Sequence, residues 1–179
     1  TFISKSKTFN VSKPSYIVSL YFDIISKSNP LLVCGMTCYD LTTGKGYYNE
    51  SYAKKNDIHL ALDDTIRFME SYPAQEMILE FNNIDNINMN DMNVSNIKSY
   101  LKLNEDIIYN ITNYEKYKKL KNQNNILDSV FKFENMLNTI ENLDMVHYNY
   151  ARISLVSLLD YVINHQENLI SKLQPPKMY

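Results

Sequence analysis

The stretch that decides the fold is Leu31-Leu32-Val33-Cys34-Gly35-Met36-Thr37-Cys38-Tyr39-Asp40-Leu41-Thr42-Thr43-Gly44-Lys45-Gly46. Residues 31–40 are mostly apolar, β-branched or aromatic, a composition typical of a strand. The polar residues that follow include Gly44, which can adopt the positive φ of a tight turn. The stretch therefore predicts a strand, a short turn and the beginning of another strand.

Similar patterns on both sides extend this hairpin into a larger sheet. Residues 15–25 predict a strand before the hairpin, and residues 46–52 predict its second arm, so that three strands form an antiparallel meander. From Asp57, the expected N-cap, apolar residues recur at helical spacing until Pro73. Residues 76–81 then predict a buried strand, parallel to the first because a right-handed helical crossover joins them.

The remaining segments give weaker patterns. We expect a loop at 82–93, a short helix at 92–103, a fifth strand at 106–112 and helices at 114–120, 126–143 and 146–169. The resulting element order predicts an α/β protein: a ribonuclease H-like five-stranded mixed sheet with flanking helices, followed by a C-terminal helical segment. We expect a lead-in at 1–15, a main domain at 16–143 and a helix leading out of it at 144–179.

Composition narrows the classes of function. The 179 residues suffice for one domain, and a net charge of −2 argues against a domain that coats nucleic acid. Cys34 and Cys38 lie four positions apart in a predicted strand, roughly 13 Å between Cα atoms, so we expect both to be reduced. No apolar run approaches the roughly 20 residues that cross a membrane. We expect an intracellular monomer, and Thr1 in place of Met suggests a piece of a longer protein.

Two stretches resemble the connector domain (domain II) of the MutS family of DNA mismatch repair proteins. In the first, the turn stretch is similar at Gly35, Asp40, Thr43 and Gly44, and the segment around Pro73 and Glu76 resembles the family's link from helix to central strand. In the second, the helix at residues 151–166 resembles the entry into the core or lever domain. The similar positions there are Leu158, Leu159 and Tyr161, followed by Pro175 and Pro176. The sequence departs from the family at Arg152, Ser154 and His165.

The resemblance implies a non-catalytic connector that links mismatch-binding, lever and ATPase domains and offers a docking surface to MutL-type partners. ATP, Mg²⁺ and mismatched DNA would be bound by the parent protein only, because this chain has no phosphate-binding glycine loop. Phe68-Met69-Glu70 matches the letters of the family's mismatch-reading Phe-x-Glu motif. It lies inside a predicted helix, however, so we expect Phe68 to face the sheet.

Two alternatives remain open. An active ribonuclease H-like nuclease would hold two metal ions with carboxylates, for which Asp23, Asp63 or Asp64, and Asp85 stand at suitable places in the order of elements. The chain could also be an unrelated protein-interaction module. A lysine cluster is interpreted as a solvated helix face, with a phosphate-contacting patch as the alternative; its members are Lys116, Lys118, Lys119 and Lys121.

Overall fold

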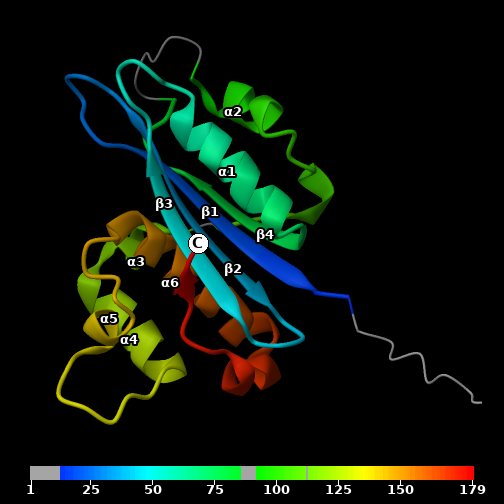
Figure 1. The fold of residues 1–179 in the computed structure, drawn as a ribbon, viewed down its shortest axis with the longest axis vertical. Helices are drawn as coiled ribbons and strands as arrows, with labels where there is room; N and C mark the ends of the chain where they lie inside the picture. The colour runs from blue at the N-terminus through cyan, green and yellow to red at the C-terminus, as the bar shows by residue number, and fades with distance from the viewer. Residues whose placement is uncertain (1–12, 86–91, 112) are drawn as a thin grey trace, which may run out of the picture.

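The structure is a computed structural model that describes residues 13–85, 92–111 and 113–179. Its centre is a mixed sheet of six strands in the order β5-β4-β1-β2-β3-β6, with helices on both faces (Figure 1). The strands are β1 (Tyr16–Ile24), β2 (Leu32–Asp40), β3 (Gly46–Tyr52), β4 (Ala74–Phe81), β5 (Ile108–Asn110) and β6 (Lys177–Met178). The predicted α/β class is confirmed.

The connectivity of the central strands follows from the lengths of their links. Strands β1, β2 and β3 form the expected antiparallel meander, because short turns join them. Strand β4 is parallel to β1, as the crossover through α1 (Leu60–Ser71) predicts, and β5 is parallel to β4. The other helices are α2 (Val94–Tyr100), α3 (Glu115–Lys118), α4 (Leu120–Val130), α5 (Thr139–Asn142) and α6 (Asn149–His165).

Alternation along β1 divides the core into two layers. Val18, Leu20 and Phe22 point to one face, where they pack in a core that includes α1 and α2 residues. Ile17 and Tyr21 point to the opposite face, which is covered by α6 and by the three short helices before it (Figure 1). Every residue of α6 from 151 to 159 is buried, so this helix is an integral layer of the fold.

Several predicted boundaries were wrong. The predicted single helix at 126–143 is divided into α4 and α5 by a non-helical segment at residues 131–138. Helix α1 begins at Leu60, with His59 as its N-cap, whereas Asp57 forms a bridge with Lys54 in the preceding turn. A sixth strand, β6, extends the sheet beyond the five expected strands because the C-terminal tail pairs with β3.

The C-terminal part of the chain shares one hydrophobic core with the sheet. The core on the α6 face includes residues from both sides of position 143, among them Leu127 and Leu159. The predicted domain boundary at 143–144 stays a prediction. Within the residues that the structure describes, no helix is long and apolar enough to cross a membrane. The predicted lead-in up to residue 12, residues 86–91 of the predicted loop and Thr112 lie outside the described residues.

Candidate functional site at the carboxyl ends of β1 and β4

The parallel strands β1 and β4 end side by side, with Phe22 opposite Phe81. In α/β sheets ligands bind at the carboxyl ends of such strands, so this end of the sheet is the expected position of a ligand site. Asp23 lies at the end of β1, and Asn82 follows β4 directly. By alternation from Tyr21, the side chain of Asp23 is on the α6 face of the sheet.

Protein donors occupy both carboxylate oxygens of Asp23. Oδ2 accepts hydrogen bonds from the Tyr21 hydroxyl and from Nδ2 of Asn82, each at 2.9 Å. Oδ1 accepts the backbone N–H of Ile24 at 2.7 Å. The amide oxygen of Asn82 in turn accepts the Tyr114 hydroxyl at 2.9 Å. Asp23, Asn82, Tyr21 and Tyr114 therefore form one connected hydrogen-bond network, which we call the Asp23 network.

Aromatic rings close the space around this network. The ring of Tyr21 stacks on Tyr150 with centroids 6.3 Å apart and lies 6.4 Å from the tilted ring of Tyr114. Tyr150 meets Tyr52 edge to face at 6.1 Å. Burial, followed by the nearby charge of Asp23, raises the pKa of the Tyr21 phenol, which keeps it protonated and able to donate.

Glu80 lies two residues before Asn82 on the same face and is only 6% exposed. Burial raises the pKa of its carboxyl to about 7, although the backbone N–H of Ile111 and the positive charge of Lys118 favour the ionised form. The sequence patterns did not predict Glu80, Asn82 or Tyr114 as site residues. An acidic residue inside the apolar run of residues 76–81 was the available signal for Glu80.

The aspartates that a nuclease would need do not converge. Asp63 and Asp64 belong to α1, which covers the face opposite Asp23; Asp63 accepts the Tyr100 hydroxyl, and Asp64 pairs with Arg67. Asp85 accepts the backbone N–H of Val94 at 2.9 Å. Among residues 13–85, 92–111 and 113–179, no group of three or more histidine, cysteine, aspartate or glutamate side chains could hold a metal ion.

The turn between β2 and β3 is organised by Asp40. Its carboxylate accepts the backbone N–H of Thr42 at 2.9 Å and the Thr43 hydroxyl at 2.8 Å, and it also accepts the backbone N–H of Ser15 at 3.2 Å. Burial opposes ionisation, but these hydrogen bonds prevail and hold the pKa of Asp40 below its ordinary value. Gly44 has a φ of +74°, the left-handed conformation expected of it.

The other residues of the predicted family motif lie in or next to α1, β4, α6 and the C-terminal tail. Leu158 and Leu159 are fully buried, and the Tyr161 hydroxyl donates to Glu76 at 2.8 Å, which joins α6 to β4. Pro73 follows the end of α1, Pro175 is exposed and Pro176 is buried. That these positions belong to a family motif stays a prediction.

Three further expectations concern residues outside the network. Phe68 is completely buried against the sheet, as expected for the coincidental Phe-x-Glu match. Cys34 and Cys38 are both buried and unpaired. In the lysine cluster, Lys116 pairs with Asp160 and Lys118 pairs with Glu115, which favours the interpretation as a solvated helix face.

Fold and site together define an α/β protein in which the carboxylate at the end of β1, Asp23, is hydrogen-bonded to donors of the protein itself. No protein-family model matches the chain. The chain is similar to the putative DNA mismatch repair protein mutS homolog L359 of Acanthamoeba polyphaga mimivirus, with 24% identity over 193 residues. The match covers 94% of this chain but only 17% of that protein. The similarity supports a relationship to MutS proteins.

Proposed function

We propose that the chain is a non-catalytic connector of a MutS-like mismatch repair protein, with a ribonuclease H-like fold. In this function it links the mismatch-binding, lever and ATPase domains mechanically and offers a docking surface to MutL-type partners. ATP, Mg²⁺ and mismatched DNA are bound elsewhere in the longer protein. The similarity to a mutS homolog along 94% of the chain supports the family assignment.

The Asp23 network is the observation that carries the non-catalytic part of the proposal. A metal-dependent nuclease needs carboxylate oxygens that are free to bind the ions. Asp23 instead has a protein donor on each oxygen, and Asp63 and Asp64 are on the other side of the sheet. Strand ends whose polar groups are already hydrogen-bonded within the protein suit a rigid spacer better than a catalytic centre.

One experiment separates the connector from the nuclease. The purified protein is incubated with single-stranded DNA, duplex DNA and RNA–DNA hybrid in the presence of Mg²⁺ or Mn²⁺, beside an Asp23→Asn variant. We expect no cleavage above background from either protein. Metal-dependent cleavage by the wild type that Asp23→Asn abolishes would establish the nuclease instead.

A second experiment tests the mechanical role in the full-length protein. Tyr161→Phe removes the hydrogen bond from α6 to Glu76 on β4 and leaves the ring in place. One hydrogen bond contributes about 1 kcal/mol, so we expect the stimulation of ATP hydrolysis by mismatched DNA to fall about fivefold. Basal hydrolysis should be unchanged. Tyr109→Phe, which removes the hydroxyl of an exposed tyrosine on β5, is the matched control.

A further inference from the structure

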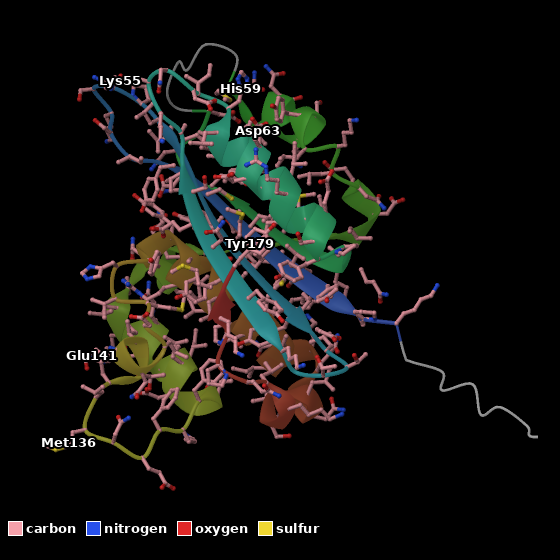
Figure 2. The ribbon with its side chains drawn as sticks, viewed as in Figure 1. Lys55, His59, Asp63, Met136, Glu141 and Tyr179 are labelled. Carbon is pink, nitrogen blue, oxygen red and sulfur yellow. The ribbon has the colours of Figure 1, made fainter. Side chains whose placement is uncertain are left out.

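Two apolar side chains project from the segment between α4 and α5. Met136 is 103% exposed and Leu137 is 57% exposed. Figure 2 shows Met136 at the outer end of this segment, directed away from the sheet. We call these two residues the apolar tip. Single exposed apolar residues are ordinary, but two adjacent ones at the end of a projecting segment form a contact surface without a partner in this chain's described residues.

The backbone on both sides of the apolar tip is held by one pair of asparagines. Nδ2 of Asn135 donates to Oδ1 of Asn142 at 2.6 Å, and Nδ2 of Asn142 donates back to Oδ1 of Asn135 at 2.9 Å. The same amides bind the backbone of Leu137, through its N–H and through its carbonyl, each at 3.1 Å. The tip is therefore preorganised.

The ends of the segment are anchored in the protein. Asn138 and Glu141 form a reciprocal capping box at the start of α5, with hydrogen bonds of 2.9 and 3.0 Å. Phe131 on one side and Ile140 on the other are buried in the core on the α6 face. Because the backbone of the tip is already fixed, binding costs it little conformational entropy, which is a property of an efficient interface anchor.

The sequence around the tip is acidic. Four exposed carboxylates lie between residues 128 and 147, namely Asp128, Glu134, Glu141 and Asp144, against one lysine, Lys132. Glu141 accepts the backbone N–H of Asn138 at the end of the segment between α4 and α5, and Asp128 accepts the hydroxyl of Thr139, the first residue of α5. The complementary surface is an apolar pocket bordered by lysine or arginine.

We infer that the apolar tip docks into such a basic-rimmed apolar pocket on another domain of the longer MutS-like polypeptide. This inference rests on the proposed function, in which the chain is one part of a multidomain protein. The relative's remaining length leaves ample room for that partner, because the matched region covers only 17% of it. Methionine suits this position, since its flexible side chain adapts to irregular pockets.

Oxidation of methionine in the full-length protein tests the inference. Hydrogen peroxide is added to the folded protein, and oxidation at each methionine is followed by peptide mass spectrometry, with N-acetylmethionine amide as the free reference. An undocked, fully exposed Met136 reacts at the reference rate. A docked Met136 should react about tenfold more slowly. Met36, which is completely buried, should stay unoxidised and thereby reports that the protein remains folded.

Charge variants identify the basic rim. Glu134→Lys should increase oxidation of Met136 to near the reference rate, whereas Glu167→Lys, at an exposed position on another segment, should leave it protected. Oxidation of wild-type Met136 at the reference rate, or protection that Glu134→Lys does not change, would overturn the inference. The nuclease and ATPase assays test the proposed function separately, so a failure of this inference alone can be distinguished from a failure of the proposed function.

Discussion

Gly35 on β2 lies directly against the backbone of Tyr150 at the first turn of α6. A β-carbon at position 35 would be 2.1 Å from the Tyr150 carbonyl oxygen and 2.7 Å from the backbone nitrogen of Ala151. Because both neighbours are backbone atoms, they cannot move aside without shifting the helix. This contact sets how closely α6 packs on the sheet.

We therefore expect Gly35→Ala to destabilise the protein by about 3 kcal/mol, because overpacking forces α6 away from β2. Urea unfolding followed by circular dichroism measures the change. Lys45→Ala, an exposed substitution in the turn after β2, should alter stability by less than about 0.5 kcal/mol. Equal stability of Gly35→Ala and the wild type would mean that α6 is not packed as described.

The raised pKa of Glu80 leads to a specific dependence of the free energy of unfolding on pH. Burial raises its pKa from the ordinary 4.5 to about 7 in the folded protein, so the folded state binds a proton more tightly than the unfolded state does. Stability from this group is therefore present at low pH and is lost as the pH rises from about 4.5 to about 7.

Glu80→Gln removes this titration while keeping the size of the side chain. We expect the variant to gain about 2 kcal/mol relative to the wild type when both are moved from pH 5 to pH 8. Unfolding by urea at the two pH values gives the comparison, in which the other carboxyl groups cancel. The same pH profile for both proteins would show that the environment of Glu80 does not penalise its charge.

Arg152 is a buried residue whose guanidinium joins three segments. It donates to Oε1 of Gln123 on α4 at 3.1 Å and to the backbone carbonyls of Met145 and Val146, each at 2.7 Å. Burial lowers the pKa of the guanidinium from its ordinary value. A fourth hydrogen bond reaches Oδ1 of Asn149 at 3.2 Å. We expect Arg152→Met to cost about 3 kcal/mol, since four acceptors lose their donor.

Arg152→Lys should not restore the lost stability, because an ammonium group cannot reproduce the planar fork of donors. Thermal unfolding of the two variants beside the wild type measures this. Recovery of wild-type stability with lysine would mean that charge alone matters at this position and that the geometry of the hydrogen bonds does not.

Tyr179 holds the C-terminal tail on α1. Its ring meets Phe68 and Tyr72 edge to face at 5.4 and 5.7 Å, and its hydroxyl lies 3.0 Å from that of Ser71. Tyr179→Ala should cost about 1 kcal/mol and speed hydrogen exchange at the C-terminal end of α1. Tyr109→Ala, which alters a similarly exposed tyrosine on β5, should leave exchange in α1 unchanged.

The sequence predicted the elements whose signals are local. Alternation and turn residues placed β1, β2 and β3 within about two residues, and Pro73 placed the end of α1. Strands β5 and β6 are only three and two residues long, so tertiary pairing rather than local preference defines them. The division of the helix at 126–143 had a local signal that was overlooked, the capping box from Asn138 to Glu141.

The candidate site was less predictable than the fold. Asp23 was visible as a carboxylate at the end of a strand, but its hydrogen-bond partners come from segments up to 59 residues away along the chain. Two of the three departures from the family resemblance, Arg152 and Ser154, are also explained only by the structure. Arg152 binds α4, and the Ser154 hydroxyl donates to the Ser19 carbonyl at 2.8 Å.

Thermal unfolding in the presence of Mn²⁺ tests the central claim most directly, namely that protein donors already occupy the strand-end carboxylate. The melting temperature of the wild-type protein should stay within about 1 °C as Mn²⁺ increases into the millimolar range, because an ion that does not bind the native state cannot stabilise it. A rise of several degrees that Asp23→Asn abolishes would contradict the account.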